Sequence, residues 1–349
     1  MDTALLLEWT IKSAILLMVM TGGFAYLTLF ERRVLARLQV RIGPNRAGPF
    51  GILQPIADGL KLIFKEELIP AGANKLIFIL APVITVFPAL VITAVIPWGE
   101  TVVLFGRSIP LHLADINVGV LYITAIASIA VYGITLAGWS SNNKYAMMGG
   151  LRATAQMISY ELALGLAFVS PIMLAGSMRV MDIVQTQKEM GWFLWLVMQP
   201  LAPIIFLISS IAEVNRAPFD MPEAEQELTA GYHTEYSGMK FALFFMAEYI
   251  KMIAVSMIAA TLFFGGFLGP DLTWIPGVGQ YLGWLNAPIL GPVWLFAKVI
   301  ALLFVMVWLR ATSPRIRYDR LMAFGWKILL PVSLLNVLIT AVIIVVRGG

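Results

Sequence analysis

A series of long apolar segments limits what this chain can fold into. The hydrocarbon core of a bilayer is about 30 Å thick, so a helix needs roughly 20 apolar residues to cross it. Backbone groups cannot pair with water at that depth, and such segments therefore become helices. Eight windows meet the requirement. They are residues 5–29, 76–97, 115–137, 154–175, 192–212, 239–265, 288–309 and 327–346.

The composition agrees with this pattern and excludes a water-soluble globule. Hydrophobic residues make up 60% of the sequence and charged residues 13%, against about 45–50% and about 25% in soluble domains. The chain has no cysteine, and its two histidines, His112 and His233, lie outside the windows. Thiolate-ligated clusters are excluded, and a haem between facing helices is not expected. We predict an all-α polytopic membrane protein, one integral membrane domain over residues 1–349, with no redox centre of its own.

Lysine and arginine indicate how eight spans would be oriented. An even number of spans places both termini on one side. The odd-numbered connections between spans carry 17 of the 24 basic residues, and loops rich in such residues face the cytoplasm. We therefore expect these connections in the cytoplasm and both termini in the periplasm, with the protein in the inner membrane of a bacterium.

The first of these connections, a basic cytoplasmic loop over residues 31–75, contains a predicted amphipathic helix. Over residues 50–67 the apolar side chains share one helical face. A helix of this kind can lie in the membrane interface as an anchor. The polar stripe mixes charges of both signs, which also suits a docking rim for a soluble partner, beside a gap that admits an amphiphile. That stripe is Gln54, Asp58, Lys61 and Lys65.

A second cytoplasmic connection, residues 213–240, is acidic although it lies on the basic face. Asp220 and Glu223 have the spacing of a helix capping box, and a solvated acidic helix is one interpretation of the pattern. Carboxylates that are crowded and partly dry cannot all ionise, and they titrate as a coupled set that suits proton storage and relay. The six carboxylates of this loop are Glu213, Asp220, Glu223, Glu225, Glu227 and Glu235, against the basic residues Arg216 and Lys240.

Four charged residues fall inside predicted spans: Glu161, Glu248, Lys251 and Lys298. Ionisable groups in a membrane are costly and are functional candidates by default. Glu248 and Lys251 are three residues apart and share a helix face, so a local structural ion pair is the alternative. Glu161 has no basic partner in its own span. Together with Glu213 and Glu248 it would form a polar path from the acidic loop into the membrane, provided that the helices adjoin.

Several stretches of the chain resemble a known family. Residues 51–66 (GILQPIADGLKLIFKE) and 218–228 (PFDMPEAEQEL) resemble the two signatures of the H-type membrane subunit (chain 1) of NADH:quinone oxidoreductase, respiratory complex I. The resemblance extends over essentially the whole chain. Further stretches that fit are residues 31–33 (ERR), 41–45 (RIGPN), 235–238 (EYSG) and 246–249 (MAEY).

The resemblance implies a membrane protein that forms a quinone-access chamber with the peripheral arm and couples quinone reduction to proton translocation. Implied partners are peripheral-arm subunits of the B, D and I type, membrane-arm subunits of the A, J and K type and the lipid bilayer, but no nucleic acid. Quinone is the substrate, no cofactor is bound covalently, and iron–sulfur clusters and flavin belong to partner subunits. No metal site is implied.

The resemblance also implies roles for individual residues. Residues at or near the quinone chamber would be Glu31, Arg32, Arg41, Asp58, Arg216 and Phe219. Acids that link the chamber to the proton path would be Glu161, Glu213, Glu223, Glu225, Glu227, Glu235 and Glu248. Two other functions stay open from the residues alone. One is the related subunit of a membrane-bound hydrogenase, and the other is a stand-alone ion-coupled transporter, against which the lack of an evident internal repeat counts.

Overall fold

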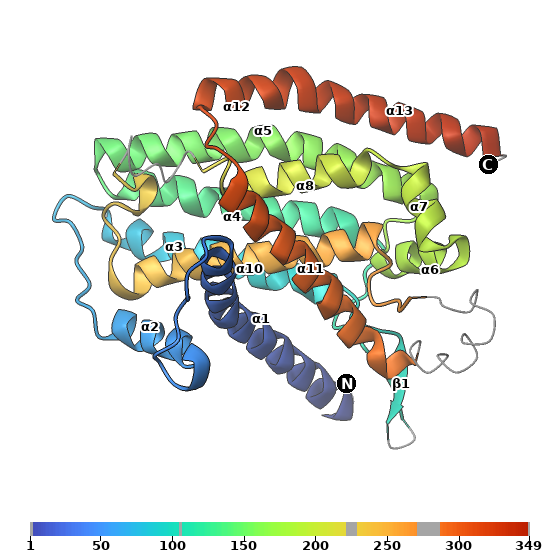
Figure 1. The fold of residues 1–349 in the computed structure, drawn as a ribbon, viewed down its shortest axis with the longest axis horizontal. Helices are drawn as coiled ribbons and strands as arrows, with labels where there is room; N and C mark the ends of the chain where they lie inside the picture. The colour runs from blue at the N-terminus through green and yellow to red at the C-terminus, as the bar shows by residue number, and fades with distance from the viewer. Residues whose placement is uncertain (1–2, 105–106, 221–228, 271–286, 348–349) are drawn as a thin grey trace.

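The computed structural model describes residues 3–104, 107–220, 229–270 and 287–347, and within them the protein is almost entirely helical (Figure 1). The long helices are α1 (Thr3–Leu38), α3 (Lys75–Ile92), α4 (Gly119–Ser140), α5 (Lys144–Ala175), α10 (Gly238–Phe263), α11 (Gly291–Thr312) and α13 (Leu330–Arg347). Shorter elements are α2 (Gln54–Ile63), α6 (Val180–Met190), α7 (Trp192–Met198), α8 (Ala202–Glu213), α12 (Tyr318–Phe324) and the hairpin β1 (Thr101–Leu104) with β2 (Arg107–Pro110).

Seven helices in the described part of the chain are long and apolar enough to cross a membrane, one fewer than the eight predicted spans. The difference lies at residues 192–212, where two short helices, α7 and α8, replace one long one. Proline removes a backbone donor and disfavours the helical conformation of the residue before it. Pro200 follows Gln199, whose φ of −138° and ψ of 58° end α7. The chain at this window is therefore broken near its middle.

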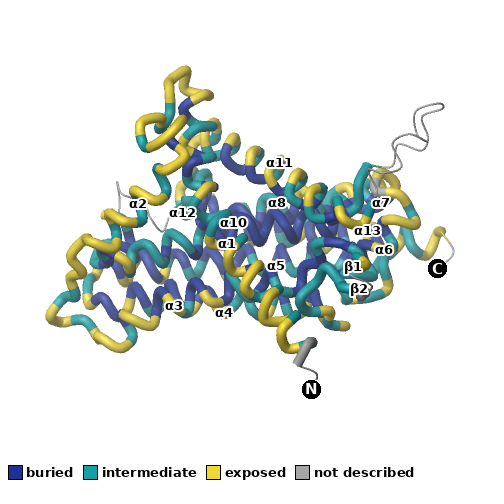
Figure 2. Tube along the Cα trace, turned by 90° about the horizontal axis from the view of Figure 1, so that it is seen from below, coloured by how far each residue is buried: buried dark blue, intermediate teal, exposed yellow. Residues whose placement is uncertain are grey.

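The first connection also starts later than predicted. Helix α1 continues to Leu38, so Glu31 and its neighbouring arginines lie on a helix and not in a loop. Helix α2 lies within the predicted amphipathic stretch and none of its residues is buried. Its apolar side chains Ile56, Leu60 and Ile63 are half exposed, and Figure 2 shows α2 at the exposed margin of the molecule.

Helix α10 forms the centre of the fold. It contacts α1, α3, α5, α8 and α11, and every residue from Tyr249 to Phe263 is buried. A helix that is apolar all round belongs in the interior, and small residues such as Ala254 and Ala260 let neighbouring helices approach closely. Figure 1 shows that the two chain ends lie toward the end of the molecule that carries β1 and α6, away from α2.

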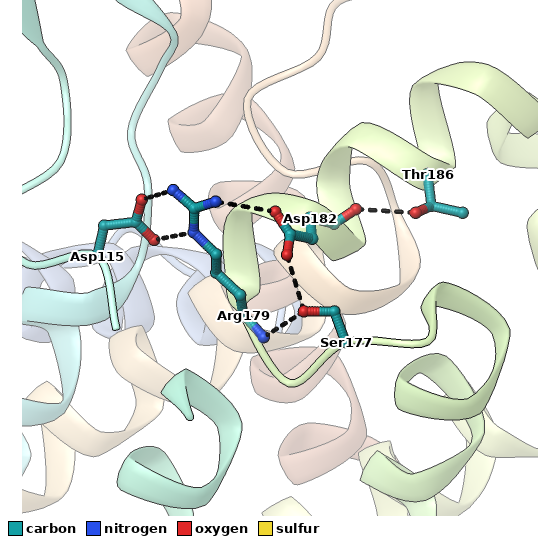
Figure 3. A network of polar contacts seen from close by, with 5 residues as sticks. All are labelled: Asp115, Ser177, Arg179, Asp182 and Thr186. Carbon is teal, nitrogen blue, oxygen red and sulfur yellow. Dashed lines mark hydrogen bonds and ion pairs between the residues drawn. The ribbon is translucent and has the colours of Figure 1, made fainter. Parts of the chain in front are cut away.

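A polar network ties two connections together at that end (Figure 3). Arg179 precedes α6 and donates from Nε to Asp115 Oδ1 over 2.8 Å, while a second guanidinium nitrogen pairs with Asp115 Oδ2. Its Nη1 lies 3.2 Å from Asp182 Oδ1. Ser177 Oγ donates to Asp182 Oδ2 over 2.8 Å. The bidentate pair joins the segment before α4 to the start of α6. The negative charge of Asp182, in the first turn of α6, also interacts favourably with the helix dipole.

We expect this network to loosen as the pH falls. His112 interacts electrostatically with Asp115 and Arg179 of this network, and partial burial lowers its pKa. The bond to Arg179 holds the pKa of Asp115 below its ordinary value. Both groups are depressed in the folded chain, so their stabilisation is complete above the unfolded pKa and is lost as the pH falls through the folded value. For His112 the loss begins below about pH 6.5.

Hydrogen exchange of the purified complex at pH 7.5 and pH 5 tests this expectation. After correction for intrinsic rates, backbone amides of residues 111–120 and 176–186 should exchange faster at pH 5. The variant His112→Gln, which is neutral at both pH values, should remove most of the difference. Equal protection of the unaltered protein at the two pH values would contradict the prediction.

Candidate functional site

Glu31 lies at the centre of a buried ionic cluster. Its side chain, on α1, is only 2% exposed. Tyr249 Oη of α10 donates to Glu31 Oε2 over 2.6 Å. Arg216 Nη1 lies 3.2 Å from Glu31 Oε1, and Arg310 of α11 pairs with the same oxygen. One carboxylate thus connects α1, α10, α11 and the segment after α8.

Arg216 joins this cluster to a second carboxylate. Its Nε pairs with Glu248 of α10, and its guanidinium carbon lies 4.4 Å from the centroid of the Tyr249 ring. The planar guanidinium can bind carboxylates and stack on an aromatic ring at the same time, which an ammonium group cannot. Arg216 itself is buried. We call these five residues the arginine cluster: Glu31, Arg216, Glu248, Tyr249 and Arg310.

The cluster is balanced in charge. Two carboxylates stand against two guanidinium groups, and buried charges are tolerated when they are paired in this way. A small cavity lies against the cluster, and apolar residues of α8, α10, α11 and the turn after α8 line its other side. The side chains that line it are Glu31, Ile211, Val214, Arg216, Met252, Met306, Val307 and Arg310.

A second, larger cavity of about 660 Å³ lies among α4, α5, α8 and α10. Its walls are mainly aliphatic, but they include Glu161, Glu213 and Lys251. Ser128 Oγ of α4 donates to Glu161, and the Lys251 ammonium interacts electrostatically with Glu213, Glu248 and Glu161. We call this space the acid cavity. Its volume is in the range of small-molecule pockets, with a few polar groups in an apolar surround.

The cluster and the acid cavity share two chain segments. On α10, Glu248 belongs to the cluster and Lys251, one turn further along the helix, lines the cavity. At the end of α8, Glu213 lines the cavity and Arg216, three residues later, belongs to the cluster. The three helices that carry Glu161, Glu213 and Glu248 do adjoin. Glu248 pairs with Arg216, and it also interacts electrostatically with Lys251.

The remaining residues predicted for the chamber occupy three other places. Arg32 Nη1 lies 2.7 Å from Asp58 Oδ2, and the other oxygen of Asp58 accepts from Gln54, so this pair joins α1 to α2 at a half-exposed position. Phe219 is buried with its ring centroid 5.6 Å from that of Tyr160 on α5. Arg41 is exposed and donates to Gln39. Arg41 therefore does not reach the cluster within this chain.

The acidic loop is only partly described. Glu223, Glu225 and Glu227, together with the predicted capping box, lie outside the described residues. Glu235 accepts a 2.6 Å hydrogen bond from Asn143 at the start of α5. Beside it, Tyr236 stacks on Phe78 with ring centroids 4.0 Å apart, and burial raises the pKa of Tyr236 to about 12. These contacts hold the chain before α10 against α3 and α5.

Two members of the arginine cluster, Tyr249 and Arg310, were not among the predicted site residues. Tyr249 follows Glu248 directly, inside a stretch that fits the family, and this was the available signal. Arg310 falls one residue beyond a predicted span, in a run of basic residues that a loop assignment explains. Nothing in the sequence shows that its side chain turns inward to Glu31. Among the described residues, no group of three His, Asp or Glu side chains could hold a metal ion.

Comparison with known proteins identifies the family of this chain. The family described as NADH dehydrogenase matches residues 11–341. The H subunit of NADH-quinone oxidoreductase from Thermomicrobium roseum is 51% identical, covering 98% of each chain. The H subunit numbered 1 of Geobacter metallireducens is 51% identical over 96% of each chain, and the H subunit of Protochlamydia amoebophila 52% over 91% of each. The chain therefore belongs to the NADH dehydrogenase family, the family of the multi-pass H subunit of NADH-quinone oxidoreductase, respiratory complex I.

Proposed function

We propose that this protein forms the chamber in which the peripheral arm reduces quinone, and that it couples this reduction to proton translocation. The chamber residues in this proposal are Glu31, Arg32, Arg41, Asp58, Arg216 and Phe219. The coupling acids are Glu161, Glu213, Glu223, Glu225, Glu227, Glu235 and Glu248. Quinone is the substrate, and the electrons come from iron–sulfur and flavin centres of partner subunits.

The observation that carries the proposal is the adjacency of the arginine cluster and the acid cavity. Reduction of quinone takes up protons and changes the charge in the chamber. Arg216 contacts both Glu31 and Glu248, and Lys251 lies one turn from Glu248. A change of charge at one end therefore alters the field at the other across a low-dielectric interior, where charges interact strongly. Local electrostatic changes of this kind can drive longer-range responses.

The substrate would enter beside α2. The apolar face of this helix is exposed. The chain carries basic residues before the helix, at Arg41 and Arg46, and at its end, at Lys61 and Lys65. A helix of this form lies in the membrane interface, so its apolar face would contact lipid. The Arg32–Asp58 pair fixes α2 to α1. We place next to this pair the entry by which an amphiphilic quinone would pass from the membrane toward Glu31 and Arg216.

The proposed topology has eight crossings. In this topology α7, of 7 residues, and α8, of 12 residues, form one crossing between them as two short helices. The chain ends would then lie on one side of the membrane, and the distribution of basic residues would put that side in the periplasm of a bacterium. Peripheral subunits of the B, D and I type would dock on the opposite face, and A-, J- and K-type subunits within the membrane.

The transporter alternative is less well supported by the arrangement. It requires Glu161 and Glu248 to share an ion site. Glu161 lines the acid cavity, whereas Glu248 pairs with Arg216 in the cluster. The near-full-length relatives reported above are named as subunits of NADH-quinone oxidoreductase, which favours that complex over a membrane-bound hydrogenase.

Replacement of Glu213 by glutamine tests the proposal. Coupled NADH:quinone turnover of the complex in proteoliposomes is expected to fall by about tenfold, which is about 1.4 kcal/mol of activation free energy. NADH oxidation by ferricyanide, which needs no quinone, should not change. Glu189→Gln, at an exposed position on α6, is the matched control. Normal quinone turnover and normal proton pumping in Glu213→Gln would refute the assigned role.

A further inference from the structure

A buried glutamine on α5 holds the segment that connects the arginine cluster to the acid cavity. Gln156 has no exposed surface. Its Nε2 donates to the carbonyl oxygen of Ala212 over 2.8 Å and to that of Phe219 over 2.7 Å. A third acceptor, Asn215 Oδ1, lies 3.2 Å away. One amide group therefore bonds both ends of residues 212–219 and a side chain between them.

The segment that this amide holds carries two candidate functional side chains. Glu213 turns into the acid cavity, and Arg216 reaches Glu31 and Glu248. Within the segment, Phe219 N donates to Arg216 O over 2.8 Å. Asn215 has a φ of 57°, a conformation that non-glycine residues adopt mainly where their surroundings hold them. The path of the chain here depends on external contacts, and Gln156 supplies several of them.

The chemistry at this position requires a donor. Three oxygen atoms converge on one nitrogen, and an amide NH₂ group offers two hydrogens to share among them. An ionised carboxylate of the same shape accepts only and would place negative charge against three acceptors. A protonated carboxyl group could still donate one hydrogen bond. The site therefore distinguishes a donor from an acceptor of almost identical size.

We infer that Gln156 is a positioning residue for coupled quinone reduction, because its amide fixes residues 212–219 and with them the placement of Arg216 and Glu213. It bonds the backbone of Phe219 but does not line the acid cavity, and it acts through the segment that it holds. The inference rests on the function proposed above for Arg216 and Glu213.

Two substitutions separate the donor role from packing. Gln156→Glu preserves the shape and Gln156→Met preserves much of the volume. At pH 7.5 both should lower NADH:quinone turnover at least tenfold without changing NADH:ferricyanide activity. Between pH 7.5 and pH 6, Gln156→Glu should recover several-fold relative to the unaltered complex at the same pH, because its protonated form donates. Gln156→Met should not recover.

The matched control is Gln185→Glu, the same change at an exposed position of α6. It should follow the unaltered complex at every pH. Unaltered turnover in Gln156→Glu overturns the inference, as do equal losses in both Gln156 variants with no recovery at acid pH. A measurement that does not depend on variant assembly is hydrogen exchange of the unaltered complex. Backbone amides of residues 214–219 should be protected like those of α5, and rapid exchange there also overturns the inference.

The outcomes distinguish this inference from the function on which it rests. If Glu213→Gln lowers coupled turnover and Gln156→Glu does not, only the positioning role fails. If Glu213→Gln and replacement of Arg216 both leave quinone turnover normal, the proposed function fails, whatever the Gln156 variants do.

Discussion

Replacement of Arg216 by methionine is expected to reduce NADH:quinone turnover at least a hundredfold, about 2.7 kcal/mol of activation free energy. The guanidinium contacts Glu31, Glu248 and the Tyr249 ring at once. Removing one partner of a buried ion pair leaves a desolvated charge and costs about 3–5 kcal/mol. Glu31 keeps Arg310 as a partner in this variant. We therefore expect the energetic cost to arise chiefly at Glu248, which loses its guanidinium partner.

The measurement compares NADH:quinone and NADH:ferricyanide activities in membranes, normalised to the amount of assembled complex. Arg216→Lys should give an intermediate result, because it keeps the charge but loses the planar fork that serves two carboxylates. Arg320→Met removes an exposed arginine and should behave like the unaltered complex. Quinone turnover close to normal in Arg216→Met would show that the cluster has no part in the reaction.

Replacement of Lys251 by methionine is also expected to have a large effect on coupled turnover. Lys251 is 7% exposed and lies among three carboxylates in or beside the acid cavity. Without its ammonium group, the carboxylates Glu213 and Glu161 would lie in the same mainly apolar cavity with less compensating positive charge. We therefore expect about a tenfold loss of coupled turnover, and no recovery when an uncoupler removes the proton gradient.

The control variants for Lys251 separate charge from packing. Lys251→Arg keeps a positive charge and should retain more activity than Lys251→Met. Lys188→Met removes an exposed lysine that pairs with Glu100 and should have no effect on turnover. If uncoupler restores Lys251→Met to normal turnover, the lysine affects only the response to the gradient and not the transfer of charge through the cavity.

The break in the fifth predicted span could have been recognised in the sequence from a proline, which an average of hydrophobicity over the window does not register. Average hydrophobicity over residues 192–212 is high, and this supports one crossing. Pro200 stands at the centre of that window, where a continuous helix would need its backbone N–H. The structure ends α7 at Met198 and begins α8 at Ala202. Hydrophobicity determines that a segment is buried in lipid, and backbone chemistry determines whether it is one helix or two.

The sequence by itself determined that this chain is a helical membrane protein and which buried acids it carries. Long apolar runs leave the backbone no alternative in lipid, and charged residues inside them can be recognised wherever they fall. The family was also readable, since its signatures are contiguous stretches of residues.

Only the tertiary structure decided which charges meet. Glu31, Arg216, Glu248 and Arg310 are far apart in the chain, and spacing along one helix shows which residues share a face but not what that face contacts. Hence Glu248 pairs with Arg216, Lys251 lines the acid cavity, and Arg41 remains on the surface. The contacts of Gln156 could not be predicted from the sequence for the same reason. Its three acceptors come together only when the chain after α8 folds back onto α5.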